Sequence, residues 1–159
     1  MTQLWLIPAD ETSYQQTLAE PRDFTRAPDK PSAFPDTARV WGVRTDPDHP
    51  GAPWERNKRN LERLSPGDPL LIYRNSKSQY VAAGRIGGPI WHTEWVRDEL
   101  WNSGPALDIF HIEDWSPVNL DPETVNRALD YKENFVPQGL WRVADDRPTD
   151  RLLQRIDRE

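Results

Sequence analysis

A β-hairpin is the clearest structural signal in the chain, at residues 70–86, whose sequence is LLIYRNSKSQYVAAGRI. Residues 70–74 and 79–86 both contain apolar β-branched or aromatic side chains, and the polar residues 75–78 separate the two runs. Two such runs joined by a short polar loop predict antiparallel strands that lie side by side in a sheet. The hairpin therefore indicates that a β-sheet forms the centre of the fold.

Further short strands are predicted on both sides of this hairpin, with a few helices between them. Apolar or aromatic runs predict strands at residues 4–8, 38–44, 107–115 and 139–143. Helices are expected at residues 54–64, 122–129 and 150–156, and residues 9–38 are expected to be mostly irregular, with one helical turn near residues 14–18. This order predicts an α+β fold, in which a few helices flank a curved mixed sheet or pseudo-barrel.

The composition excludes several classes of catalytic site. The chain has no cysteine, and its three histidines, His49, His92 and His111, lack the spacing of metal ligands. Gly87-Gly88 is followed by proline and lacks the Lys-Ser/Thr of a phosphate-binding loop. We therefore expect a non-catalytic protein that needs neither a metal nor another cofactor.

The length of 159 residues has room for one domain of ordinary size. We expect this domain to span residues 1–145, and residues 146–159 to form a C-terminal helix or a linker to a further domain. The N-terminal sequence MTQLWLIPADETSYQQ has no basic leader, and no stretch approaches the ~20 apolar residues of a membrane span. A cytoplasmic protein without membrane contact is predicted.

Positive charge is concentrated in the middle third of an acidic chain. The net charge is −6, yet residues 39–97 contain ten basic and six acidic residues, a balance of +4, against −10 for the rest. Basic side chains that displace counterions supply most of the sequence-independent affinity for nucleic acid. The middle third is therefore the expected contact surface for a polyanion.

Eight tryptophans are the most unusual feature of the composition. Trp5, Trp115 and Trp141 lie in apolar strand runs and are expected to pack in the core. The other five lie in or beside predicted loops: Trp41, Trp54, Trp91, Trp95 and Trp101. Stacking of a base on such a ring is worth ~1–3 kcal/mol, which suffices to hold a nucleotide flipped out of a duplex.

Several motifs in this order resemble the EVE domain. They are VWGVR at residues 40–44, RNL at residues 59–61, Gly67-Asp68, and LIYR at residues 71–74. The closing segment QGLWRV at residues 138–143 is similar to the last strand of that family, and residues 72–86 are similar to the hairpin of the related YTH domains. The resemblance extends over about residues 1–143, although Thr45 replaces the asparagine that follows GVR in the family.

The resemblance implies a PUA-like pseudo-barrel that binds modified bases of DNA or RNA. Trp41 then holds the position of the first cage tryptophan, Trp91 or Trp95 lies in the region of the second, and Asn57 or Asn60 lies near the base edge. The predicted base-binding residues are Trp41, Gly42, Val43, Asn57, Asn60, Tyr73, Trp91 and Trp95. Basic residues predicted to contact the nucleic-acid backbone are Arg44, Lys58, Arg59, Arg74, Lys77 and Arg85.

The first functional hypothesis is a non-catalytic DNA-binding module for a flipped methylated or hydroxymethylated base. Such a module would serve as the specificity domain of a modification-dependent restriction endonuclease, with a nuclease or NTPase domain or subunit as its partner. Two alternatives remain open: a YTH- or ASCH-like module that binds methylated adenine in RNA, and a PUA-like protein that acts on free modified nucleosides. A free-nucleoside site would not need the basic middle third.

Overall fold

Short strands and a few helices alternate along the computed structural model, which describes residues 3–26, 30–43, 54–88, 91–92 and 108–158. The described strands are β1 (Trp5–Ala9), β2 (Arg22–Asp23), β3 (Thr37–Val43), β4 (Pro69–Arg74), β5 (Gln79–Ile86), β6 (Trp91–His92), β7 (Asp108–Leu120) and β8 (Trp141–Arg142). The described helices are α1 (Glu11–Thr17), α2 (Trp54–Arg63), α4 (Pro122–Ala128) and α5 (Asp150–Arg158), with a 3-10 turn, η1 (Asn75–Lys77).

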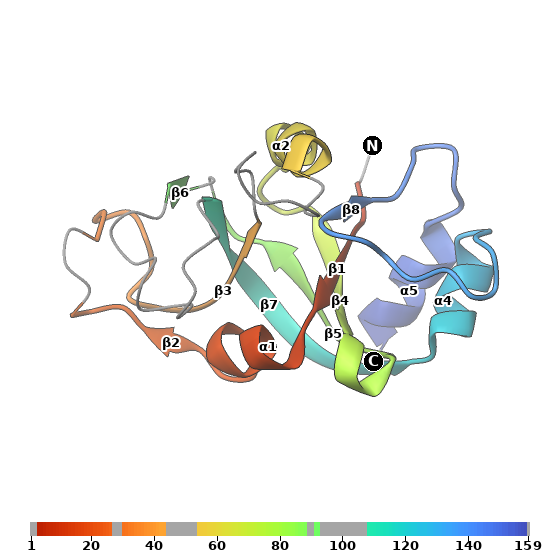
Figure 1. Cartoon of the computed structure of the whole chain (residues 1–159), viewed down its shortest axis with the longest axis horizontal. Helices are drawn as coiled ribbons and strands as arrows, with labels where there is room; N and C mark the ends of the chain where they lie inside the picture. Colours follow the sequence, from red (N-terminus) through yellow and green to blue (C-terminus); the bar gives the residue numbers. More distant parts are fainter. Residues whose placement is uncertain (1–2, 27–29, 44–53, 89–90, 93–107, 159) are drawn as a thin grey trace.

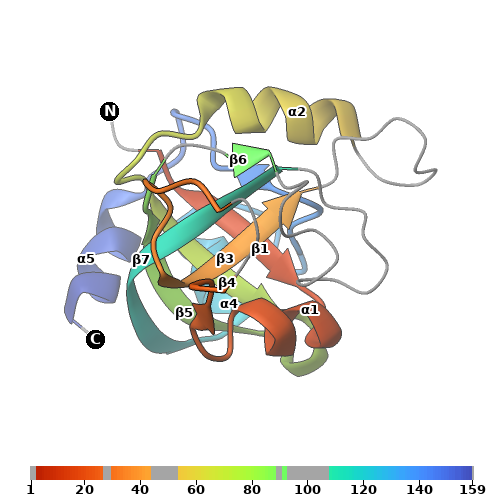
Figure 2. The same cartoon turned by 90° about the vertical axis from the view of Figure 1, so that its left-hand side faces the viewer.

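The strands form one curved, mixed sheet (Figures 1 and 2). Its hydrogen-bonded order is β2-β3-β7-β5-β4-β1-β8, and β6 pairs with β7 beside this path. The β1–β4 pair is parallel and the other described pairs are antiparallel. The end strands β2 and β8 do not pair, so the sheet is not closed. The predicted α+β class with a curved mixed sheet is confirmed.

The hairpin predicted from residues 70–86 is present as β4 and β5. Leu70 pairs with Gly84, and Ser78 ends η1 in the left-handed region at φ 48°. The turn between α2 and β4 is fastened to the same hairpin, because the Gly67 amide donates to the Ile86 carbonyl over 2.7 Å. Gly67 has a φ of 91°, a backbone conformation that residues other than glycine rarely adopt.

Pro8 lies inside β1, although proline cannot donate to a strand ladder. The antiparallel partner β8 pairs only with Trp5 and Leu6, so this edge of β1 is open at Pro8. Proline is tolerated at such an open edge. The short β8 therefore explains how a proline-containing run forms a strand in the centre of the fold.

Alternate residues along the strands pack on the two faces of the sheet. The inner cluster consists of Trp5, Ile7, Ala9, Tyr14, Leu18, Trp41, Val43, Leu61, Leu70, Ile72, Ala82, Ile86, Phe110, Ile112 and Leu140. The outer cluster consists of Leu4, Leu6, Leu71, Tyr73, Tyr80, Ala83, Leu120, Val125, Leu129, Val143 and Leu152. The period of two along a strand produces this division, so neighbouring residues of β1 and β4 belong to different clusters.

Three tryptophans predicted to be core residues differ in burial. Trp5 is fully buried in the inner cluster, as predicted. Trp115 is half-buried, with the guanidinium of Arg39 4.5 Å from its ring centroid. Trp141 is also half-buried, and its indole nitrogen donates to the Tyr131 hydroxyl over 3.0 Å. The last two rings therefore pack at the edge of the core.

Some elements differ in length from the sequence prediction. Helix α1 begins at Glu11, because the Asp10 carboxylate caps it by accepting a hydrogen bond from the Ser13 amide over 3.0 Å. Strand β7 continues past Trp115 to Leu120, where it pairs with β5, and β8 covers only part of residues 139–143. Residues 9–38 contain α1 and β2 and are thus less irregular than expected.

The predicted helices near the C-terminus are present as α4 and α5, which lie together at one side of the sheet (Figure 1). Leu152 of α5 is 1% exposed and belongs to the outer cluster with Val125 of α4 and with Leu129, which follows the last residue of α4. No helix within the described residues has the length and apolar character to cross a membrane. The described part of the chain also contains no group of three His, Cys, Asp or Glu side chains placed to hold a metal.

We expect Gly87→Ala to lower the free energy of unfolding by about 1–3 kcal/mol. A Cβ at residue 87 would lie 2.3 Å from the His111 ring. That ring is buried and packs edge-on against Phe34, with 5.9 Å between centroids, so it has little room to move. Urea denaturation measures the decrease. The same substitution in a His111→Ala background should cost far less, and an equal cost in both backgrounds would show that the ring is no obstacle.

Candidate nucleic-acid interface

Trp41 lies within β3 and belongs to the inner cluster. Its Cα pairs with that of Phe110 in β7, and its side chain is 8% exposed. The next residue, Gly42, is half-buried, and Val43 returns to the inner cluster. Three of the predicted base-binding residues thus occupy consecutive strand positions, and the tryptophan among them also has a structural role.

Strand pairing brings Trp91 to the same end of β7 as Trp41. Ile109 of β7 pairs with Gly42 on one side and with Trp91 of β6 on the other. Neighbouring strands are about 4.8 Å apart, so the backbones of Trp91 and Gly42 are separated by about 10 Å. The two segments that are expected to supply the cage tryptophans therefore converge on one end of the sheet.

Hydrogen bonds join the inner side of α2 to the segment that precedes β8. Asn60 Nδ2 donates to the Leu140 carbonyl over 2.7 Å, and Asn57 Oδ1 accepts from the Leu140 amide over 3.4 Å. The guanidinium of Arg56 donates to the Gln138 carbonyl. Asn57 and Asn60 are 4% and 8% exposed. In this arrangement both amides anchor backbone, and their contact with a base edge stays a prediction.

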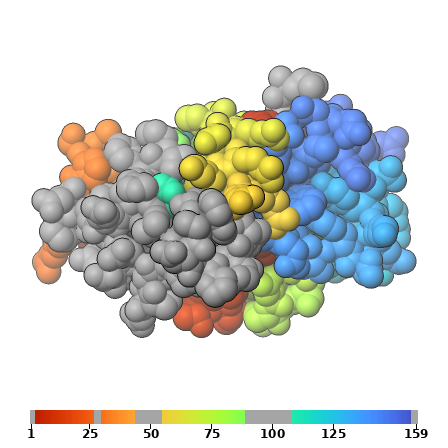
Figure 3. Space-filling model, turned by 45° about the horizontal axis from the view of Figure 1, so that its top comes forward, coloured from red at the N-terminus to blue at the C-terminus, as the bar shows by residue number. Residues whose placement is uncertain are grey.

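The outer side of α2 presents cations to solvent. Lys58 and Arg59 are exposed, and neither makes an ion pair with another residue in the described ranges. Figure 3 shows α2, in yellow, on the molecular surface beside the blue C-terminal part of the chain. These two side chains are thus accessible from solvent, and their contact with a nucleic-acid backbone stays a prediction.

Two other predicted backbone contacts are already engaged within the protein. Arg74 Nε donates to Glu11 over 2.8 Å, and its guanidinium lies 4.4 Å from the Tyr14 ring centroid. Hydrogen bonds from Arg74, Gln15 and Ser76 hold the pKa of Glu11 well below its usual range. Arg85 donates to the Gly67 carbonyl over 2.9 Å and remains 45% exposed, whereas Lys77 of η1 is exposed and makes no ion pair with a described residue.

Tyr73 is separated from Trp41 by the sheet. Tyr73 is 5% exposed in the outer cluster and packs against Tyr80, with 5.1 Å between ring centroids. Its neighbour Ile72 belongs to the inner cluster, where Trp41 also lies. The structure therefore does not bring Tyr73 together with Trp41 in one pocket.

Arg44, Trp95 and the side chain of Trp91 lie outside the described part of the chain. Arg56 was not among the predicted site residues, and its guanidinium also lies 5.3 Å from the Trp141 ring centroid. The basic character of α2 was visible in the sequence. Which of its cations turns inward depends on contacts with residues about eighty positions away.

Comparison with solved structures identifies several domains with the same fold. No family model matches the chain, and no curated protein matches its sequence. The N-terminal domain of Thermococcus gammatolerans McrB, solved bound to m5C DNA, matches with a TM-score of 0.68 and 14% identity, over 98% of this chain and 99% of that one.

YTH domains form a second group of similar structures. The YTH domain of Zygosaccharomyces rouxii MRB1, solved with N6-methyladenosine RNA, matches with a TM-score of 0.61 and 11% identity, over 98% of this chain and 86% of that one. The Pho92 YTH domain, solved with m6A, matches with a TM-score of 0.55 and 11% identity, over 98% and 83%. The chain therefore has the EVE- and YTH-like fold that its sequence motifs predicted, shared with the McrB N-terminal domain and the YTH domains.

Proposed function

We propose that this protein is a non-catalytic module that binds nucleic acid and holds one flipped, modified base against Trp41. The observation that carries the proposal is that almost the whole chain shares the fold of a domain solved with m5C DNA. The pairing of β3 and β6 with one end of β7, which brings the backbones of Trp41 and Trp91 together, supports it. Aromatic rings accept any planar base, and the surrounding contacts decide which base is preferred.

DNA is the favoured ligand. The McrB domain that was solved with m5C DNA has a higher TM-score, 0.68, than the YTH domain solved with N6-methyladenosine RNA, 0.61. The coverage of the matched chain is also higher, 99% against 86%. RNA is the alternative ligand, because the YTH domain with the same fold was solved with N6-methyladenosine RNA.

Base binding and backbone binding are assigned to different elements. A ring that is 8% exposed offers little surface, so stacking on Trp41 requires side chains that cover it to move aside. Lys58 and Arg59 on the outer side of α2 would contact phosphates, which adds affinity without choice of sequence. In the proposed role as a specificity module of a modification-dependent restriction system, cleavage belongs to a partner domain or subunit.

A binding panel tests the proposal. Matched duplexes and single strands carrying one m5C, one 5-hydroxymethylcytosine or one m6A are compared with unmodified controls by fluorescence anisotropy at fixed salt. We expect one modified duplex to bind at least tenfold more tightly than its control, the equivalent of ~1.4 kcal/mol. Preference for a modified single-stranded RNA would select the alternative, and equal binding of every modified and unmodified oligonucleotide would refute a reader function.

A further inference from the structure

Arg56 of α2 carries a charge that no described carboxylate neutralises. The side chain is half-buried, its Nη2 donates to the Gln138 carbonyl, and its guanidinium lies 5.3 Å from the Trp141 ring centroid. Its Nε is buried without a hydrogen-bond partner among the described residues, and within those ranges Arg56 makes no ion pair. A guanidinium has five N–H donors, so most of the hydrogen-bonding capacity of Arg56 is unused in the described part of the fold.

Trp141 holds this guanidinium in place. The Trp141 ring packs against Phe135, with 5.0 Å between ring centroids, and its indole nitrogen donates to the Tyr131 hydroxyl over 3.0 Å. The ring is thus fixed by contacts that do not involve Arg56. A guanidinium that lies on a fixed ring and is bonded to a backbone carbonyl has few conformations left to lose when a ligand binds. An anion that reaches Arg56 therefore meets a preorganised cation.

Three arginines share one flank of α2. At about 100° per residue, Arg56, Arg59 and Arg63 fall within about 60° around the helix axis and span about 10 Å along it. Arg59 and Arg63 are exposed, and neither makes an ion pair with another described residue. One strand of a duplex advances about 3.4 Å per phosphate along its axis. The length of this flank therefore matches about three consecutive phosphates.

The helix that carries this flank lies close to the proposed cage. Figures 1 and 2 show α2 across one end of the sheet, near both β6 and β8. Leu61 of α2 belongs to the inner cluster together with Trp41, and so does Leu140, to which α2 is hydrogen-bonded. A strand whose modified base reaches Trp41 can therefore pass along α2.

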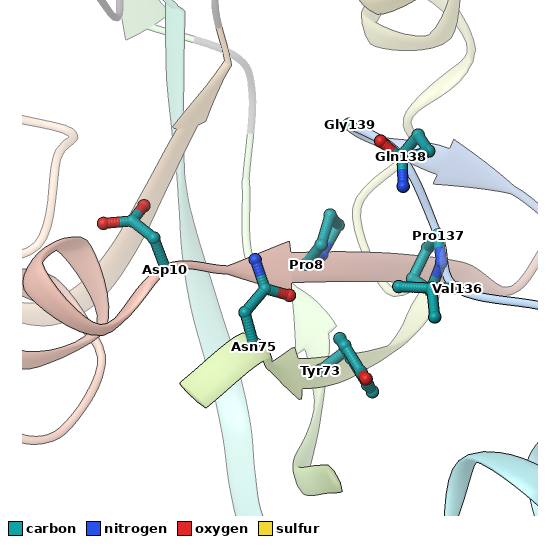
Figure 4. Close-up of a pocket in the computed structure, with 8 residues that line it drawn as sticks. All are labelled: Pro8, Asp10, Tyr73, Asn75, Val136, Pro137, Gln138 and Gly139. Atoms are coloured by element: carbon teal, nitrogen blue, oxygen red, sulfur yellow. The ribbon is translucent and has the colours of Figure 1, made fainter. Parts of the chain in front are cut away.

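The pocket on the neighbouring segment does not suit a phosphate. Residues 136–139 help to line a pocket of about 440 Å³ beside β1 and β4 (Figure 4). No described residue that lines it is a cation, and Asp10 contributes a carboxylate to its lining. An anion that binds Arg56 is therefore expected beside α2 and outside this pocket.

On this geometry, and resting on the proposed function, we propose that Arg56, positioned by Trp141, binds a backbone phosphate of the nucleic acid together with Arg59 and Arg63. Nη1 and the second hydrogen of Nη2 are the donors that remain after the bond to Gln138. Two such N–H groups of one planar guanidinium match two oxygens of a phosphate. The contact increases affinity for every sequence without choosing a base. Trp141 is a positioning residue, because it acts on the phosphate only through Arg56.

Arg56→Gln tests the phosphate contact. It should weaken binding of modified and unmodified duplexes alike by about tenfold at low salt, the equivalent of ~1.4 kcal/mol. The plot of log affinity against log salt should become shallower by ~0.9. Fluorescence anisotropy at several salt concentrations measures both quantities. Arg147→Gln is the matched control, because Arg147 also lies on an aromatic ring, 4.3 Å from the Tyr131 centroid, and donates to the Leu129 carbonyl at the end of α4. It should keep the affinity and the slope of wild type.

A double-mutant cycle tests the role of Trp141. Trp141→Leu removes the ring beneath the guanidinium and should weaken binding by about fivefold in the wild type, but by less than twofold when Arg56 is already glutamine. Trp141→Phe keeps an aromatic ring there and should lose less affinity than Trp141→Leu. Urea denaturation of each variant measures the cost in stability separately from the cost in binding.

Wild-type affinity and slope for folded Arg56→Gln would overturn the proposal, because Arg56 would then serve only to join α2 to Gln138. Equal losses from Trp141→Leu in both backgrounds would refute the positioning role. A decrease confined to the modified duplex would place Arg56 beside the base and refute the phosphate contact. If the wild type binds duplexes but prefers no modified base, the proposed reader function fails instead, and the unmodified duplex still decides whether Arg56 binds phosphate.

Discussion

Trp41→Ala is expected to lower the free energy of unfolding by about 3–5 kcal/mol, the cost of deleting a large buried aromatic side chain. Trp41 is 8% exposed, and the inner cluster around it includes Val43, Leu61 and Phe110. Domains of this size have unfolding free energies of about 5–15 kcal/mol, so the variant would have a much smaller stability than wild type. Urea denaturation followed by circular dichroism measures the effect.

A leucine at the same position separates packing from base stacking. Trp41→Leu retains apolar contact with the inner cluster but has no aromatic face, so it should stay folded while its preference for the modified oligonucleotide falls at least tenfold. Trp115→Leu is the matched control, because Trp115 is half-buried in β7 and packs against the same cluster. Wild-type stability of Trp41→Ala would contradict its core position, and an unchanged base preference of folded Trp41→Leu would exclude its ring from the cage.

The central hairpin and most helices could be predicted because their signals are local. A turn after residue 74 and an apolar run on each side are sufficient to define β4 and β5. The extent of β7 was not predictable in this way, because residues 116–120 form a strand only by pairing with β5. Helix α1 has a local signal in Asp10, a favoured capping residue, but the prolines that follow favour an irregular segment.

The candidate site was harder to predict than the fold, because side-chain partners are distant in sequence. Asn60 has a side-chain amide, the kind of group that was expected to contact a base edge. Its amide instead donates to the carbonyl of Leu140, eighty positions away. Arg74 belongs to the basic middle third, yet Glu11 of α1 engages it. Tyr73 follows an inner-facing residue and therefore faces outward, a consequence of strand alternation that its sequence neighbours do indicate.

Replacing both Lys58 and Arg59 with alanine is expected to weaken binding of modified and unmodified oligonucleotides equally, by about a hundredfold at low salt. The two side chains are exposed on α2, away from the anchoring amides Asn57 and Asn60. A charged hydrogen bond contributes about 1.5 kcal/mol or more, and two such bonds amount to about 3 kcal/mol. The preference for the modified base should persist, because phosphate contacts position the strand without choosing a base.

The salt dependence of the binding affinity tests whether Lys58 and Arg59 contact phosphates. Removing one basic side chain that neutralises a duplex phosphate should flatten the plot of log affinity against log salt by ~0.9, so the double variant should have a slope shallower by ~1.8. Lys132→Ala with Arg151→Ala removes the same charge from exposed positions near α4 and on α5, and should leave the slope nearly unchanged. Equal slopes for wild type and the α2 variant would mean that Lys58 and Arg59 face only solvent in the complex. A selective decrease in affinity for the modified oligonucleotide would instead place them beside the base, because a group that serves every sequence alike cannot distinguish one base from another.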